Sequence, residues 1–371
     1  MIKKFLPKIV FSFIDILTGL LLLIIGFNIS SSIWANEISQ ILTVGTITPG
    51  ILLTVFTRKI LVGNSINIES MFKNMRLCFF INLVLLSYFT LNISVIFHTS
   101  IVYMILMFFL CIYLSLCSIY LPLSVIWFSL SKNNKIFFKI KIFVSSLRLL
   151  GAVLSLFFQE KSIFILFLAT TPFIEFLFFK KNISNFLLSI GKSDQDKKGD
   201  NLFSLSVGMV RGLTSIIKIQ IERIFPGVLS TIIIFESVFA GILSLYERYF
   251  TRDLKPFNFL INIKVFWGIF LILYFFLFDF YEADTIKSKF FLFMICSAAL
   301  LPSILMYDFL KEEGARFVAM INISSSFFVA LIFVFNFFIL KIQSLFLFMY
   351  IFIPIIIFLL FFISFKRRDF F

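Results

Sequence analysis

The chain has 371 residues, of which 61% are hydrophobic and only 14% are charged. Soluble domains are about half apolar and about a quarter charged, so this composition excludes a water-soluble globular protein and indicates an integral membrane protein. A net charge of +14 would suggest a nucleic-acid partner in a soluble protein. Here the membrane topology accounts for that charge, and we expect no nucleic-acid partner.

Long apolar runs predict transmembrane helices, because a helix needs about 20 mostly apolar residues to cross a bilayer. The runs are continuous and do not alternate with polar residues, which favours helices over barrel strands. Proline lies inside several of them, at Pro49, Pro122, Pro172 and Pro302, and predicts kinks there. The twelve predicted segments are 5–28, 37–57, 76–97, 101–130, 137–158, 162–179, 202–225, 228–250, 256–280, 288–310, 317–340 and 344–365.

The basic residues orient these segments in the membrane. With the N-terminus in the cytoplasm, 24 of the 33 Lys and Arg residues fall on cytoplasmic segments and only 4 on outer segments. Cytoplasmic loops collect Lys and Arg, and omitting any one helix would destroy the alternation downstream. We therefore predict an all-α membrane protein with about twelve transmembrane helices and both termini in the cytoplasm.

The longest cytoplasmic connection, residues 180–201, divides the chain into two halves of six helices. The N-terminal half is 1–179 and the C-terminal half is 202–371. Because each half has an even number of helices, both have the same orientation, as in transporters built from parallel repeats. We expect the halves to rock against each other around a central cavity, with the connection as a tether.

Several kinds of chemistry have no residues to support them. The four cysteines form no CxxC pair, and the single histidine, His98, has no cluster of ligands around it. There is no glycine-rich phosphate loop. The acidic stretch 279–289 is interpreted as a solvated turn. The sequence thus predicts no metal site, no cofactor, no catalytic residues and no ATPase, and we expect that the chain is not an enzyme.

Charged residues inside the predicted helices are the candidate functional residues, since burying charge in a bilayer is costly. In segment 202–225, Arg211, Lys218 and Glu222 are spaced by seven and four residues. This spacing places them on one helical face, with Ser204 and Ser215 nearby. Arg223 points away from that face.

Segment 137–158 repeats the pattern, with Lys141, Arg148 and Ser155 seven residues apart and Ser145 beside them. The two stripes predict the walls of a cationic cavity. The arginine fork matches phosphate or carboxylate groups, so we expect this cavity to bind an anion. The predicted anion-binding residues are Arg148, Arg211 and Lys218.

The acidic residues in the helices have two interpretations. Asp15, Glu222 and Glu236 are expected either to neutralise cations or to couple transport to an ion, and Glu222 is also placed to pair with Lys218 at i,i+4. Lys141, Lys264 and Glu175 lie near cytoplasmic ends and are expected to extend toward the membrane interface.

Residues 217–250 carry a resemblance to a known family. Glu222-Arg223 closes the seventh segment, Gly227-Val228-Leu229-Ser230 follows, and the eighth segment holds Phe235 and Phe239. With "FTRKIL" at 56–61, this pattern resembles the polysaccharide (lipid-linked oligosaccharide) flippases of the multidrug/oligosaccharidyl-lipid/polysaccharide exporter superfamily. In its architecture, the whole chain resembles this family. In its sequence motif, only residues 217–250 do.

The resemblance implies a flippase that moves undecaprenyl-diphosphate-linked oligosaccharide to the outer leaflet for surface polysaccharide such as O-antigen. It implies a bacterial cytoplasmic (inner) membrane location, contact with membrane lipids, and other polysaccharide-assembly membrane proteins as further partners. Three alternatives remain. A polysaccharide polymerase would have a large Arg-rich outer loop, a small-molecule exporter would have acidic cavity residues, and a structural membrane protein would leave Arg148 and Arg211 unexplained.

Overall fold

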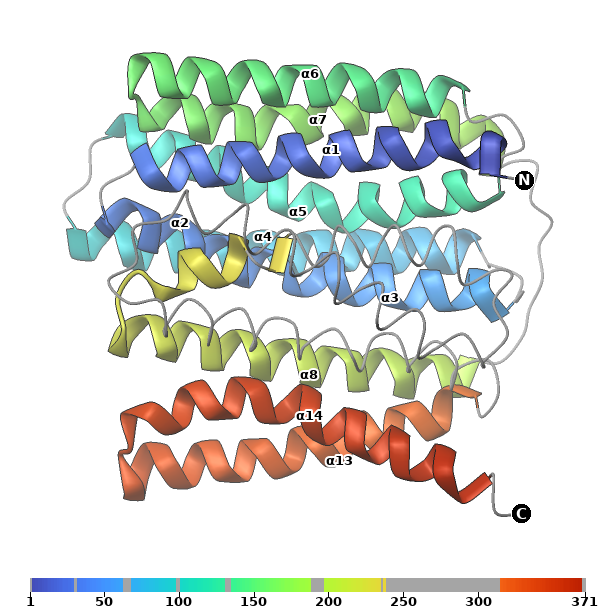
Figure 1. The fold of residues 1–371 in the computed structure, drawn as a ribbon, viewed down its shortest axis with the longest axis vertical. Helices are drawn as coiled ribbons and strands as arrows, with labels where there is room; N and C mark the ends of the chain where they lie inside the picture. The colour runs from blue at the N-terminus through green and yellow to red at the C-terminus, as the bar shows by residue number, and fades with distance from the viewer. Residues whose placement is uncertain are drawn as a thin grey trace. The chain divides into compact units, whose positions relative to one another are not determined.

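The computed structural model describes residues 2–29, 32–62, 68–97, 101–130, 135–187, 197–234, 236–237 and 314–368. Every regular element in these ranges is helical, which confirms the all-α prediction. The helices are α1 (Ile2–Ile29), α2 (Ser32–Gly45), α3 (Ile47–Val62), α4 (Ile68–Phe97), α5 (Ile101–Leu130), α6 (Lys135–Phe158), α7 (Lys161–Leu187), α8 (Lys197–Ile224), α13 (Gly314–Phe335) and α14 (Gln343–Arg368), with a short π-helix, η2 (Asn336–Leu340), after α13 (Figure 1).

Five helices of the described residues are long and apolar enough to cross a membrane. Their spanning parts are 101–119, 139–158, 161–178, 202–224 and 316–340, and each overlaps a predicted segment. The chain therefore has the helices of a multi-pass membrane protein. Segments 256–280 and 288–310, with Lys264, lie outside the described residues, as does most of 228–250. The total of twelve helices and the location of the termini stay predictions.

The chain forms two compact units, Met1–Ser230 and Thr231–Phe371. In the first unit, α6 packs on α1 and α7, α5 packs on α3, α4 and α7, and α8 packs on α3 and α2. Figure 1 shows α1, α6 and α7 side by side. In the second unit, α13 packs against α14. The predicted boundary at 180–201 separates α8 from the helices before it, whereas in the structure α8 packs with those helices.

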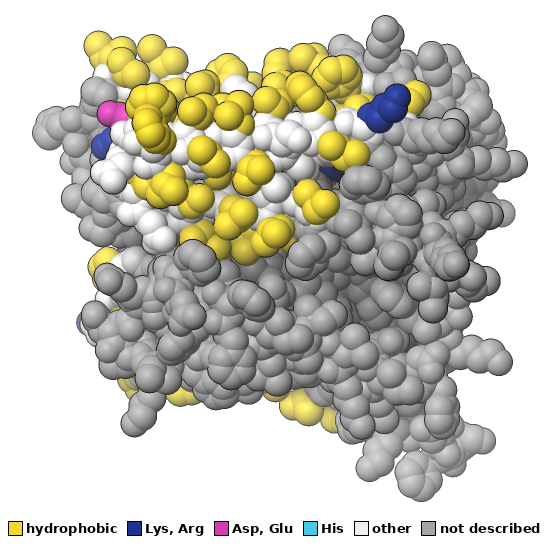
Figure 2. Space-filling model, turned by 45° about the horizontal axis from the view of Figure 1, so that its top comes forward, with side chains coloured by type: hydrophobic (Ala, Val, Ile, Leu, Met, Phe, Trp, Pro, Cys, Tyr) yellow, Lys and Arg dark blue, Asp and Glu magenta, His cyan; other side chains and the backbone are white. Residues whose placement is uncertain are grey.

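The side chains of the first unit are sorted as expected for a protein surrounded by lipid. The exposed face of α4 is apolar and carries Leu77, Phe80, Val84, Leu85 and Leu91, whereas the buried face holds Asn82 and Thr90. Figure 2 shows one face on which the described surface is mainly hydrophobic, with charged side chains toward its edges. Polar groups face inward because only other helices, and not lipid, supply hydrogen-bond partners.

The predicted segment 37–57 is broken into α2 and α3 at Thr46. Proline has no backbone N–H, so Pro49 leaves the carbonyl of Gly45 without its helical donor. The side chain of Asn82 on α4 supplies one, since its Nδ2 donates to the Gly45 carbonyl over 3.1 Å and lies 3.4 Å from the carbonyl of Leu114. Asn82 is 1% exposed. The break is thus stabilised by a buried amide from a neighbouring helix.

The turn between α13 and α14 confirms the predicted boundary near 341. Lys341 adopts a left-handed conformation with φ 53°, and its N–H donates to the carbonyl of Asn336 over 2.7 Å. The side chain of Asn336 holds the next residue, accepting from the N–H of Ile342 over 3.0 Å and donating to its carbonyl over 3.1 Å. This buried amide closes the hairpin.

Candidate functional site

The polar stripe on α6 faces the neighbouring helices. Ser145 is 3% exposed and Ser155 is fully buried, whereas the opposite face of α6 exposes Phe143, Leu150 and Val153. Lys141 and Arg148 are two turns apart on the buried side. The prediction that these residues share an inward face is confirmed. Small residues on this face, including Gly151 and Ala152, let α6 pack closely on its partners.

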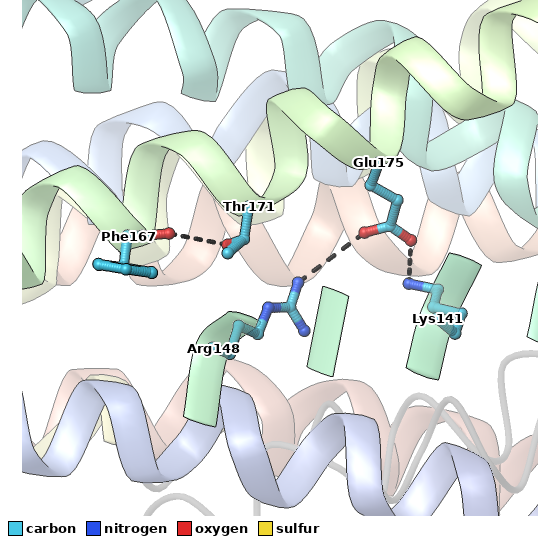
Figure 3. Close-up of polar contacts among 5 residues, drawn as sticks. All are labelled: Lys141, Arg148, Phe167, Thr171 and Glu175. Carbon is cyan, nitrogen blue, oxygen red and sulfur yellow. Dashed lines mark hydrogen bonds and ion pairs between the residues drawn. The ribbon is translucent and has the colours of Figure 1, made fainter. Parts of the chain in front are cut away.

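The stripe meets a carboxylate on α7. The Glu175 side chain is fully enclosed and forms an ion pair with the Lys141 ammonium, and its other oxygen lies 3.9 Å from Nη2 of Arg148. Figure 3 shows both cations pointing from α6 toward Glu175. The prediction that Lys141 and Glu175 extend to the membrane interface is wrong for both, because each binds the other between the helices, where the alternative is an unpaired charge at low dielectric.

Helices α1 and α5 complete the surroundings of this cluster. On α1, a Cβ added to Gly19 would lie 3.6 Å from Nη1 of Arg148, so the arginine passes close to the helix backbone there. On α5, Tyr113 and Cys117 lie one helical turn apart and close to Arg148 and Glu175. The neighbouring Thr171 hydroxyl on α7 donates to the carbonyl of Phe167 over 2.8 Å (Figure 3).

Arg211 on α8 lies against the broken helix of the first unit. Its Nη2 donates to the hydroxyl of Thr54 over 3.3 Å. A Cβ placed on Gly50 would come within 2.3 Å of Nη1, so only glycine at position 50 leaves space for the guanidinium in this place. The Thr54 hydroxyl in turn donates to the carbonyl of Gly50 over 2.8 Å. Arg211 thus contacts α3, whereas the ion pair described for Arg148 is with α7.

Glu222 makes contacts that the sequence did not predict. Its two carboxylate oxygens accept hydrogen bonds from the backbone N–H groups of Gly227 and Leu229, each at 2.7 Å. Residues 228–234 are helical, so the carboxylate caps the N-terminus of that helix, where the orphan N–H groups and the helix dipole favour a negative charge. Glu222 is 2% exposed. The capping bonds account for its position without pairing to Lys218.

The other predicted residues are distributed over both units. Lys218 is half-buried on α8. The backbone of Asp15 belongs to α1, and its side chain lies outside the described residues. Glu236, in the second unit, accepts a hydrogen bond from the hydroxyl of Tyr350 on α14.

One buried acidic residue was not predicted. Glu37, at the start of the second predicted segment, is 4% exposed and accepts a hydrogen bond from the Tyr103 hydroxyl at 2.6 Å. Its position at the end of an apolar run is typical of an interfacial residue, so only its tertiary neighbour distinguishes it. Asn82, which completes the break between α2 and α3, lies inside an apolar segment and was missed because its role depends on a contact with another helix.

Comparisons of the chain with protein-family models, with curated proteins and with solved structures found no match. The resemblance to the flippases therefore rests on the residues quoted above.

Proposed function

We propose that the chain is a transporter that moves an anionic lipid-linked oligosaccharide, carried on undecaprenyl diphosphate, from the inner to the outer leaflet of the bacterial cytoplasmic membrane. It would do so by alternating access, with both termini in the cytoplasm. The proposal makes the chain a binding and transport protein in surface polysaccharide assembly, without a catalytic residue of its own.

The observation that carries the proposal is the pair of cations on the inward face of α6. Lys141 and Arg148 lie among packed helices of a membrane protein, where placing a charge costs about 2.5–3.5 kcal/mol on insertion scales. Charged residues inside membrane helices are rare, and they usually take part in binding or transport. Guanidinium groups bind diphosphate oxygens through parallel hydrogen bonds, so Arg148 suits a phosphorylated passenger better than a cationic one.

The position of Arg211 supports the proposal independently. Its guanidinium lies inside the helix packing of the first unit, in the space that Gly50 on α3 leaves open. The α6 and α8 stripes place arginine on two helices of one compact unit. A small-molecule exporter of the same superfamily remains the alternative, and it would be expected to bind a cationic or neutral passenger.

The experiment is glycan export by the double variant R148A/R211A. It is expressed in cells that depend on this chain for one surface glycan, and export is compared at equal protein abundance. We expect export to fall to background. The matched control is R223A/K341A, which removes two exposed basic residues and is expected to export normally. Normal export by R148A/R211A would contradict the proposal.

A further inference from the structure

The carboxylate of the α6–α7 cluster is more deeply enclosed than its cations. Glu175 has no exposed side-chain surface, whereas the side chains of Lys141 and Arg148 are 14% and 16% exposed. An anion that approaches the cluster therefore meets the two cations before it meets the carboxylate. The carboxylate occupies the inner side of the position that an incoming oxyanion would take between the same two groups.

The contact between Arg148 and Glu175 is loose. Their closest nitrogen and oxygen are 3.9 Å apart, whereas a strong charge-assisted hydrogen bond has a length of about 2.7–2.9 Å and is often bidentate. Arginine has five N–H donors in a planar fork, and a phosphoryl group has several oxygens arranged to accept from that fork. A phosphoryl oxyanion is thus a better geometric match for Arg148 than the carboxylate that lies beside it.

The same face of α6 carries a further group that can form hydrogen bonds. The hydroxyl of Ser155, two turns beyond Arg148, is fully buried and forms no hydrogen bond in the part of the chain that the structure describes. Buried polar groups are almost always hydrogen-bonded, so an unsatisfied hydroxyl in line with two cations indicates a ligand or solvent partner. Gly19 leaves the α1 side of Arg148 without a side chain.

We infer that Glu175 is an internal ligand of Lys141 and Arg148, and that the phosphoryl group of a passenger displaces it. The inference rests on the proposed function for the identity of the passenger, a diphosphate. When the site is empty, Glu175 keeps the two cations paired at low dielectric. When a diphosphate binds, part of its interaction energy replaces the ion pairs with Glu175. Affinity is lowered, and the passenger can leave again.

The test compares binding of undecaprenyl diphosphate and of inorganic pyrophosphate to the purified full chain in lipid nanodiscs. The variant E175Q keeps the size of the side chain and removes its charge. We expect it to bind both probes at least about fivefold more tightly than the wild type, within the usual range of coupling between sites. R148Q is expected to bind neither. E160Q, which alters an exposed carboxylate just before α7, is expected to match the wild type.

A second carboxylate provides a sharper comparison. Asp15 lies one helical turn before Gly19 on α1. If D15N strengthens binding while E175Q does not, the assignment to Glu175 is overturned. Equal or weaker binding by E175Q also overturns it, and so does the absence of binding by every variant. If E175Q does not yield folded protein, K141Q/E175Q is compared with K141Q, and the same increase is expected.

The outcome for the proposed function is separate. If E175Q binds the probes more tightly but the wild type does not flip a lipid-linked oligosaccharide in liposomes, the proposed function is contradicted. The displacement of Glu175 by a phosphoryl group is then still supported. If the wild type flips the lipid-linked oligosaccharide but E175Q does not bind more tightly, the proposed function is supported and the displacement of Glu175 is contradicted.

Discussion

Single residues in this protein determine where a charge can lie. Gly50 on α3 gives the guanidinium of Arg211 its space, and Glu175 on α7 gives the α6 cations their counter-charge. The role of neither residue can be recognised from the sequence alone. Each acquires a role because the fold brings it against an arginine or a lysine from another helix. Small residues and buried polar groups often have this role in membrane helices, where close approach replaces the hydrophobic effect as the driving force.

We predict that G50A impairs export to about the level of R211A while the protein still folds. The added methyl group would lie 2.3 Å from Nη1, but a guanidinium at the end of a flexible side chain can swing away at small cost. Arg211 would then lose its contact with Thr54. Export and thermal unfolding of the purified protein measure the two effects.

The matched control is G212A, where a new Cβ would have nothing within 4 Å. Since alanine is a better helix former than glycine, G212A should be neutral or more stable by about 0.5–1 kcal/mol. Equal export by G50A and G212A would show that the position of Arg211 is unimportant.

We predict that the stability of Glu222 variants follows the number of capping oxygens that remain. E222A should lower the free energy of unfolding by about 1 kcal/mol, the usual effect of losing a cap, and E222Q by less, because one oxygen can still accept. Unfolding of the purified chain in detergent measures both, with R223A as an exposed neighbour expected to have no effect. Unchanged stability of E222A would contradict the capping role described for Glu222.

At the scale of the elements, the sequence was sufficient to predict that the described residues are helical and that α6 has a polar, inward face. The seven-residue spacing on α6 predicted that Lys141, Arg148 and Ser155 lie together, and the structure confirms this. The sequence was not sufficient to predict which residues on other helices this face contacts. Nothing in residues 137–158 indicates that Glu175 of α7 would bind the stripe, and nothing near Glu222 in periodicity alone indicates a cap, because both depend on contacts outside the local helical repeat.

The break between α2 and α3 shows the same limit. Pro49 predicted a kink, but the residue that makes the kink tolerable is Asn82, 33 positions away on α4. The side-chain amide replaces the helical donor that proline lacks. A kink and a remote polar residue thus form one structural unit, and either would be unfavourable alone.

We predict that Pro49 and Asn82 are energetically coupled. N82L should destabilise the protein by about 1 kcal/mol, since hydrogen bonds between membrane helices contribute at most about 1.7 kcal/mol. In the background of P49A, the new N–H at position 49 can satisfy the carbonyl of Gly45, so N82L should cost less. A double-mutant cycle of unfolding free energies measures the difference. Additive effects would contradict the described role of Asn82.

For the whole molecule, we predict that both termini lie in the cytoplasm. The reason is the strong excess of Lys and Arg on one set of loops, 24 against 4. Reporter fusions after Phe371 and within residues 281–287 should report opposite compartments, with the first in the cytoplasm. Matching compartments would contradict the prediction of twelve helices.

We infer the energy source from the proposed direction of transport. The sequence predicts no ATPase, and an anion that leaves a negative interior gains about 2.3 kcal/mol per charge for each 100 mV of membrane potential. An anionic passenger can therefore be moved outward by the potential, by an ion gradient or by removal of the product.

The central claim is tested most directly by flipping of undecaprenyl-diphosphate-linked oligosaccharide in proteoliposomes that contain only this chain. The rate is measured with and without an imposed potential, negative on the cytoplasmic side, with and without a pH gradient, and with and without ATP. We predict flipping that accelerates with the potential and is lost in R148A/R211A. A rate that ignores both potential and pH gradient but requires ATP, or that is unchanged in the double variant, would contradict it.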